Sequence, residues 1–180
     1  MSTRILSDAE HEFFYITRKR LADLPPKRII NVQTPPALAL THVFAALEGG
    51  EPAVVREAVL EFIKGVNELC DGALRKHGRV NLSAVEAAQD GFAALAEQLQ
   101  LGTEDPATYL RTVRDARAAA RQLDVVAVEA AIRTRAEARA AKDFETADRL
   151  QRELVGQGVM LLDNAEGTEW TLPAQDEPSP

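Results

Sequence analysis

The chain has 180 residues, of which 46% are hydrophobic and only 5% are aromatic. This length suits one domain or two small ones, and a core built mostly of alanine and leucine favours packed helices over a β-sandwich. The net charge of −7 excludes a protein that binds nucleic acid over its whole surface, because phosphate contacts need a basic surface.

Other function classes are also excluded by composition. No apolar run approaches the roughly 20 residues of a membrane span, and the N-terminus turns acidic before a signal-peptide core. Cys70 is the only cysteine, so we expect no disulfide framework and no thiolate metal cluster. Cys70 with His11, His42 and His77 has no zinc-ligand spacing. We therefore expect a cytoplasmic protein with no metal and no cofactor.

The first two predicted helices have clear start and stop signals. Ser7 and Glu10 form a capping box that predicts a helix start, and the prolines at 25–26 end that helix. Thr34 followed by Pro35 predicts a second start, with an end at the glycines at 49–50.

Three further helices are predicted before residue 123. Pro52 opens the longest one, Ser83 and Glu86 form a second capping box, and Gly102 ends the helix that follows it. Asp105 with Pro106 starts the fifth helix. The helix after Pro52 has an apolar stripe at spacings of three and four that predicts core: Val55, Val59, Phe62, Ile63, Val66, Leu69 and Cys70.

The sequence after Asp124 has a different character. Residues 128–141 are helical and rich in arginine, and residues 142–144 predict a turn or a break in helical phase. A second helix then runs to about Val155 and ends at Gly156 and Gly158.

One hairpin of strands is predicted at the C-terminal end. Residues 159–162 are the only good strand candidate, residues 163–167 form a turn, and residues 168–172 form a return strand. Residues 173–180 are rich in proline and polar, so we expect a disordered tail.

Two blocks of sequence resemble the C-terminal end of cysteinyl-tRNA synthetases. Residues 138–148, ARAAKDFETAD, are similar to the "ARxxKDFxxAD" run of that family. Residues 158–163, GVMLLD, and residues 167–170, GTEW, are similar to its "GIxLxD…GTxW" ending. Upstream, residues 31–38 resemble the "DFNTPxAL" element of the family's DALR domain, and residues 98–110 resemble the linker that follows it.

This resemblance implies a mainly α fold. We expect a DALR-type helical bundle over residues 1–122, and then a helical hairpin with a short β-hairpin over residues 124–172. The family's HIGH-like and KMSKS-like nucleotide motifs are missing from the sequence. We therefore expect a non-catalytic tRNA-binding module, with its catalytic counterpart absent or on another polypeptide.

The resemblance also implies an anticodon-binding site. Arg135 and Arg139, four residues apart, would face phosphates or base edges, and Phe144 would stack on a base. Asp148 and Asp163 would accept hydrogen bonds from guanine or cytosine.

Each of these residues also has a purely structural interpretation. In this interpretation the two arginines pair with Glu129 or Glu137 on a solvated helix surface, and Phe144 fills the space between the helices. Asp148 pairs with Arg152, and Asp163 only shapes its turn.

The last part of the motif has mainly structural roles in this interpretation. Trp170 is expected in the core, opposite the strand at 159–162, and Gly167 is expected to need a positive φ. Thr168 is a structural residue or a further contact.

The acidic net charge and the departure from the family pattern at Gln151 favour a rival function. Gln151 stands where the family usually has arginine, and Leu162 where it usually has glutamate. The segment 142–148 also resembles the UVR motif, a helical hairpin used for protein contacts. The rival is thus a protein-interaction or regulatory scaffold that keeps the fold and has lost RNA. The expected partners are tRNA through its anticodon arm, a full-length synthetase or another protein, without DNA or membrane.

Overall fold

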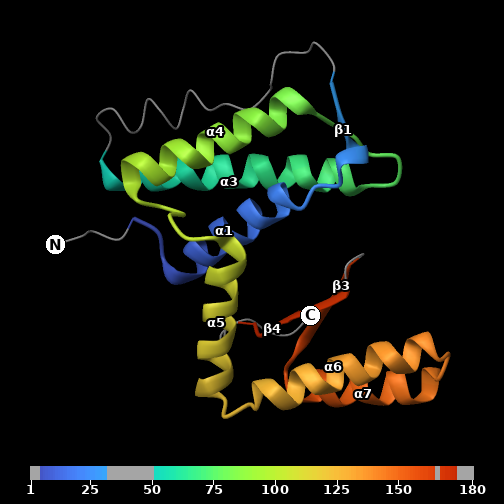
Figure 1. Ribbon diagram of the computed structural model, residues 1–180. Coiled ribbons are helices and arrows are strands. Elements are labelled where there is room, and N and C mark those ends of the chain that lie inside the picture. Colours follow the sequence, from blue (N-terminus) through green and yellow to red (C-terminus); the bar gives the residue numbers. More distant parts are fainter. Residues whose placement is uncertain (1–4, 32–50, 165–166, 174–180) are drawn as a thin grey trace. The chain divides into compact units, whose positions relative to one another are not determined.

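The computed structural model describes residues 5–31, 51–164 and 167–173, and these are mainly helical (Figure 1). The predicted helix after Thr34 and the histidine at position 42 lie outside the described residues. A 3-10 turn, η1, follows the first helix at Pro26–Arg28. The helices are α1 (Asp8–Ala22), α3 (Pro52–Leu74), α4 (Leu82–Leu99), α5 (Pro106–Ala120), α6 (Val125–Ala140) and α7 (Phe144–Gly156). The strands are β1 (Ile29–Ile30), β2 (Val80–Asn81), β3 (Met160–Asn164) and β4 (Gly167–Thr171).

The chain forms two compact units, which divide inside α5 between Leu110 and Arg111. The boundary predicted at residues 122–124 stays a prediction, and the structure adds that the last part of α5 belongs to the second unit. Ala118 is fully buried in the core of that unit, and Arg117 donates a hydrogen bond to the Leu172 carbonyl at 2.8 Å. No helix within the described ranges is long and apolar enough to cross a membrane.

Aromatic contacts join the helices of the first unit. The ring of Phe92 on α4 meets Phe14 of α1 and Phe62 of α3 edge to face, with centroid distances of 5.1 Å to each. The predicted stripe of α3 is buried in this core, apart from Leu69, which is half-buried. Burial of each large apolar side chain contributes roughly 1.5–3 kcal/mol, so this contact region holds α1, α3 and α4 together.

The predicted caps of α1 and α4 have different outcomes. The Ser7 hydroxyl accepts a hydrogen bond from the Glu10 amide at 3.3 Å, and the Glu10 carboxylate accepts one from the Ser7 amide at 2.9 Å, so this capping box is confirmed. The prediction of a capping box at Ser83 and Glu86 is wrong. Asn81 caps α4 and accepts from the Ser83 amide at 3.3 Å, because an asparagine at the end of β2 reaches the first turn earlier.

The first unit also contains a short parallel strand pair that the sequence did not predict. Strand β1 pairs with β2 in the register Ile29 to Val80 and Ile30 to Asn81. The expectation of a single strand candidate in the chain is therefore wrong. Two residues per strand are too few to give an alternating pattern.

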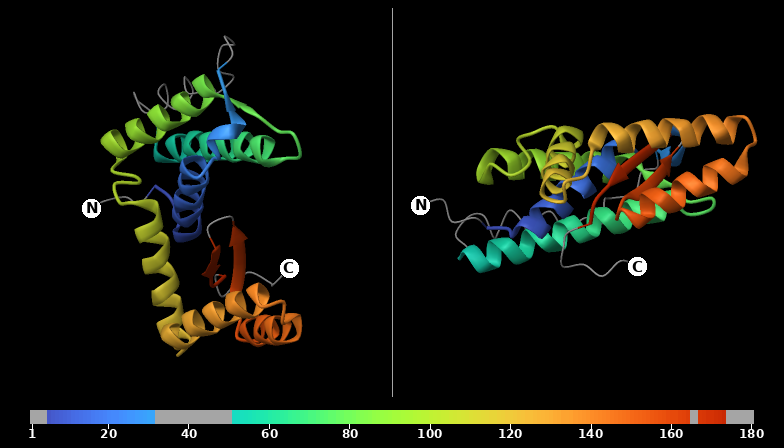
Figure 2. Two further views of the ribbon diagram at one scale, coloured as in Figure 1. Left: turned by 45° about the vertical axis from the view of Figure 1, so that its right-hand side comes forward. Right: turned by 90° about the horizontal axis from the view of Figure 1, so that it is seen from below.

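The second unit combines a helical hairpin with a β-hairpin. Helices α6 and α7 run side by side in opposite directions (Figure 2). Lys142, with a φ of 62°, makes the turn between them, and Asp143 caps α7 by accepting from the Thr146 amide at 3.1 Å. This confirms the predicted break at residues 142–144.

The strands of the second unit are antiparallel, with Leu161 opposite Trp170 and Asp163 opposite Thr168. The predicted turn at residues 163–167 is therefore too long, because β3 continues past Asp163. Gly167 has the expected positive φ, of 146°.

The core of the second unit lies under the β-hairpin. Trp170 is buried as predicted, and the Arg114 guanidinium lies 4.3 Å from its ring centre. This cation–π contact fastens α5 to β4. The other buried members of this core are Ala118, Val128, Ile132, Leu154, Val159 and Leu172.

Gly102 and Gly72 give a matched pair of substitutions for testing the core of the first unit. Gly102 has a φ of 70°, and a Cβ there would lie 2.5 Å from Cε1 of Phe14. Gly72 lies inside α3 with no atom within 4 Å of an added Cβ. We predict that Gly102→Ala lowers the free energy of unfolding by about 1–3 kcal/mol and that Gly72→Ala raises it by about 0.4–1 kcal/mol. Urea unfolding measures both changes. Equal changes in the free energy of unfolding of the two variants would contradict the close approach of Gly102 to Phe14.

Candidate functional site

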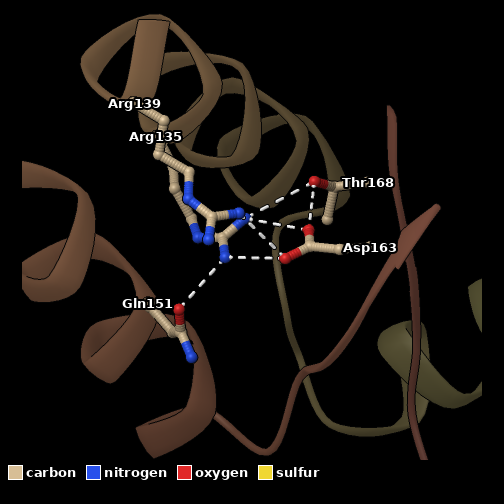
Figure 3. Close-up of polar contacts among 5 residues, drawn as sticks. All are labelled: Arg135, Arg139, Gln151, Asp163 and Thr168. Carbon is tan, nitrogen blue, oxygen red and sulfur yellow. Dashed lines mark hydrogen bonds and ion pairs between the residues drawn. The ribbon is translucent and has the colours of Figure 1, made fainter. Parts of the chain in front are cut away.

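A buried arginine organises the surface that the sequence motif occupies. Arg135 of α6 is 2% exposed, and its guanidinium forms two parallel hydrogen bonds of 3.1 Å with the two carboxylate oxygens of Asp163 on β3 (Figure 3). The same guanidinium donates to the Thr168 hydroxyl at 3.4 Å and to the amide oxygen of Gln151 at 3.0 Å. One side chain thereby connects α6, α7 and both strands.

The carboxylate of Asp163 accepts four hydrogen bonds. Besides the two from Arg135, its Oδ1 accepts from the Thr168 hydroxyl at 2.7 Å, and its Oδ2 accepts from Arg139 at 3.0 Å. The guanidinium of Arg135, followed by the Thr168 hydroxyl, holds the pKa of the Asp163 carboxyl well below its usual range. Asp163 is therefore ionised at neutral pH and tied to α6.

The two arginines of this cluster differ in exposure. The Arg139 side chain is 53% exposed and the Asp163 side chain 44%, whereas Arg135 lies beneath them. Two guanidiniums and one carboxylate leave the cluster with one net positive charge. The exposed Arg139 carries that charge at the surface.

Three residues on α7 extend this surface. Phe144 begins α7 with 61% of its side chain exposed, and Asp148 is also exposed. Spacings of four and three put Phe144, Asp148 and Gln151 on one face of the helix. Since Gln151 contacts Arg135, this face of α7 is continuous with the Arg135–Asp163 cluster.

The structural alternatives for these residues have mixed outcomes. Arg135 and Arg139 pair with Asp163 and not with Glu129 or Glu137, so the expected solvated pairs are wrong. The interpretation of Phe144 as a plug is wrong too, because its ring is exposed.

The alternatives for the two aspartates are also wrong. Arg152 donates to the backbone carbonyl of Asp148 at 3.3 Å and not to its carboxylate, because its Nε reaches back one turn within α7. Asp163 lies in a strand and faces α6, which replaces its expected role in a turn.

Sequence reasoning missed the structural role of Gln151. The sequence shows this residue only as a departure from the family's usual arginine, whereas its amide oxygen is a hydrogen-bond partner of Arg135. A signal was present, since Arg135 and Gln151 stand eight residues before and eight after Asp143. Residues equidistant from the turn of a helical hairpin face each other. Among the described residues, no cluster of His, Cys, Asp and Glu side chains could hold a metal ion.

The ion pair predicts a pH-dependent contribution to stability. Replacement of Asp163 by asparagine leaves Arg135 buried without its counter-charge, which lowers the free energy of unfolding. This loss is reduced because the carboxylate is partly exposed to solvent. We predict that Asp163→Asn lowers the free energy of unfolding by about 2–3 kcal/mol at pH 7. The exposed Asp148, changed to asparagine, should cost less than about 0.5 kcal/mol.

The sign of the pH dependence follows from the lowered pKa of Asp163. A carboxyl with a lower pKa in the folded state stabilises the protein above its unfolded pKa of about 3.9 and loses this contribution as pH falls below that value. The stability difference between wild type and Asp163→Asn should stay constant from pH 7 to about 4.5 and then narrow. Urea unfolding across this range measures it, and a difference that widens at low pH would contradict the assignment.

Comparison with known proteins shows a similarity that covers this site. Residues 125–170 match the family model described as the cysteinyl-tRNA ligase anticodon binding domain. The cysteine–tRNA ligase of Acidovorax ebreus (strain TPSY) is 33% identical over 175 residues, which are 91% of this chain and 36% of that protein. The ligase of Oleidesulfovibrio alaskensis (strain G20) is 36% identical over 115 residues, or 63% of this chain and 24% of that protein.

A further ligase shows a shorter and closer match. That of Desulfovibrio desulfuricans (strain ATCC 27774) is 42% identical over 98 residues, which are 51% of this chain and 20% of that protein. The chain thus spans about a third or less of the ligases named here. The chain is similar to part of the cysteine–tRNA ligases, and its residues 125–170 match their anticodon-binding domain.

Proposed function

We propose that the second unit binds the anticodon arm of a tRNA through one continuous face. That face consists of Phe144, Asp148 and Gln151 on α7 together with the Arg139–Asp163 pair. The observation that carries the proposal is the contact of Gln151 with Arg135, which connects the exposed stripe of α7 to the Asp163 cluster. The match of residues 125–170 to an anticodon-binding domain supports it.

The exposed side chains on this face suit single-stranded bases. RNA loops are usually read by stacking of unstacked bases on aromatic rings and by hydrogen bonds to base edges. Phe144 offers a stacking surface, and Asp148 offers an exposed acceptor for amino or imino groups. Asp163 offers one in exchange for its hydrogen bond from the exposed Arg139. Arg139 offers an exposed guanidinium to a phosphate or base edge. Arg135 supports this group from below, where it fixes Asp163.

The charge of the cluster fits a local RNA contact on an acidic protein. The chain carries a net charge of −7, which opposes contact with RNA over a broad surface. The Arg135–Arg139–Asp163 cluster contributes one net positive charge to the proposed face, and the exposed carboxylate of Asp148 offsets it. Binding should therefore depend on base contacts more than on phosphate contacts, and its salt dependence should be shallow.

We further propose that this chain serves the binding step and not aminoacylation. The similarity covers about a third or less of the cysteine–tRNA ligases, and the matched domain is the anticodon-binding one. A role in the cytoplasm beside a full-length synthetase, as an assistant or a competitor for tRNA, is consistent with this. DNA and membranes are not expected partners.

A specific observation favours the second candidate, a protein-interaction scaffold. Met160 and Leu162 on β3 are 37% and 49% exposed, on the opposite face of the hairpin from Leu161. Two neighbouring exposed apolar side chains suit a protein contact. This surface lies on the other side of the strand from Asp163, so both functions are compatible with one fold.

Filter binding of the full chain to total tRNA at low salt tests the proposed function. Phosphate contacts are strongest under these conditions, so retention of tRNA is the expected result. Absence of retention, together with a stoichiometric protein recovered from lysate, would overturn the RNA proposal in favour of the scaffold.

The exposed ring of Phe144 provides a prediction about affinity. We expect Phe144→Ala to weaken tRNA binding by about 1–3 kcal/mol, the usual contribution of one aromatic stack. The thermal unfolding temperature should change little, because the side chain is 61% exposed. Phe13→Ala, at a ring that is 37% exposed on α1, is the control and should leave tRNA affinity unchanged. Equal affinities of both variants would contradict a stacking role.

A further inference from the structure

We infer that Gln151 is a specificity-determining residue of the proposed RNA site, where its amide nitrogen donates a hydrogen bond to a base edge. This inference rests on the proposed function and extends it to a residue at which the chain departs from its family pattern. The residue combines a fixed orientation, an unused donor and a place on the proposed face.

The orientation of the Gln151 amide is set by chemistry. An arginine guanidinium has only donors, so the group that faces Arg135 must be the amide oxygen and not the amide nitrogen. Arg135 is 2% exposed and is tied to both oxygens of Asp163, so it cannot turn away from the 3.0 Å contact. The Gln151 amide is consequently held in one of its two possible orientations.

The amide nitrogen of Gln151 then points away from Arg135, as the labelled side chains in Figure 3 show. Within the part of the chain that the structure describes, no group accepts a hydrogen bond from this nitrogen. Gln151 is exposed, and its helical face also carries Phe144 and Asp148. A fixed donor with two N–H groups therefore lies at the surface, on the same helical face as the proposed stacking ring and two turns along α7 from it.

The position of this donor relative to Asp163 favours a base edge as its partner. The Gln151 oxygen and Asp163 Oδ2 accept from the same nitrogen of Arg135, at 3.0 and 3.1 Å, so the two groups are adjacent. The site thus presents a neutral donor next to a carboxylate whose Oδ2 becomes an acceptor when a base takes the place of Arg139. A Watson–Crick edge carries donors and acceptors side by side, whereas a phosphate carries acceptors only.

A neutral amide is also the side chain that satisfies the cluster without changing its charge. Glutamate at position 151 would accept from Arg135 but would cancel the net positive charge and remove the outward N–H groups. Arginine would offer donors to RNA but would leave Arg135 without this acceptor and place two guanidiniums together. The oxygen of the Gln151 amide accepts a hydrogen bond from Arg135, and its nitrogen remains available to donate to RNA.

The test compares Gln151→Glu with Gln157→Glu in the full chain. Both changes add one negative charge to the exposed surface at α7, and Gln157, the C-cap of that helix, lies outside the Arg135 cluster. The probes are tRNA and anticodon stem-loop hairpins with single-base changes in the loop, measured by fluorescence anisotropy. We expect Gln151→Glu to bind about tenfold more weakly than Gln157→Glu and to lose discrimination at one loop position.

Gln151→Met gives a second measurement without a change of charge. We expect a roughly threefold to tenfold loss of affinity for the preferred hairpin, with the salt dependence of the wild type. A merely structural role would lower the unfolding temperature of Gln151→Met while leaving discrimination between loop bases intact. Thermal unfolding of each variant separates these effects, and Gln151→Glu keeps the acceptor that Arg135 needs.

The outcomes distinguish this inference from the proposed function. In one outcome the wild type and Gln157→Glu both bind tRNA, Gln151→Glu has the affinity of Gln157→Glu, and Gln151→Met has the affinity of the wild type. That outcome would overturn the role of Gln151 and leave the proposed function standing. Loss of affinity that is uniform across all loop bases would indicate a phosphate contact and would also overturn it. Failure of the wild type to bind any tRNA would overturn the proposed function together with this inference.

Discussion

The second unit depends on one buried positive charge. A guanidinium with 2% exposure is costly unless its donors are matched, and the two terminal nitrogens of Arg135 have acceptors on α7, β3 and β4. Its Nε has no partner among the described residues. The small apolar core under Trp170 supplies the hydrophobic stabilisation, but it does not determine which polar groups meet at the surface. The contact of Arg135 with Asp163 does so, because a bidentate pair fixes both position and angle. The same pair keeps Asp163 ionised. The contact between Arg135 and Asp163 therefore both holds the proposed site in place and determines its charge.

Sequence patterns predicted the helices better than the contacts between them. The capping box at Ser7, the stripe after Pro52 and the break at residues 142–144 rest on local rules that involve neighbours in sequence, and the structure contains each of them. The strands β1 and β2 pair across about fifty residues and are too short to carry a pattern. The N-cap of α4 is Asn81 and not the predicted Ser83, because two residues that can cap a helix lie within one turn of each other.

The candidate site shows the same limit at the level of single residues. The motif brought Arg135, Arg139 and Asp163 together as a group, and the structure places them in one cluster. Their unequal exposure depends on how β3 packs on α6, which no local pattern encodes. The sequence shows Gln151 only as a difference from the family's usual arginine. Its function as an acceptor becomes visible once α6 and α7 are placed side by side.

The symmetric placement of Arg135 and Gln151 about Asp143 has an evolutionary consequence. A residue inserted into or deleted from a helix rotates every later position of that helix by about 100°, so one such event inside α6 after residue 135, or inside α7 before residue 151, would separate the guanidinium from its amide partner. Substitutions along the hairpin can preserve this contact, whereas changes of length cannot. Descendants of this chain should therefore vary freely in the identity of exposed residues on α6 and α7, while the number of residues between those two positions stays constant.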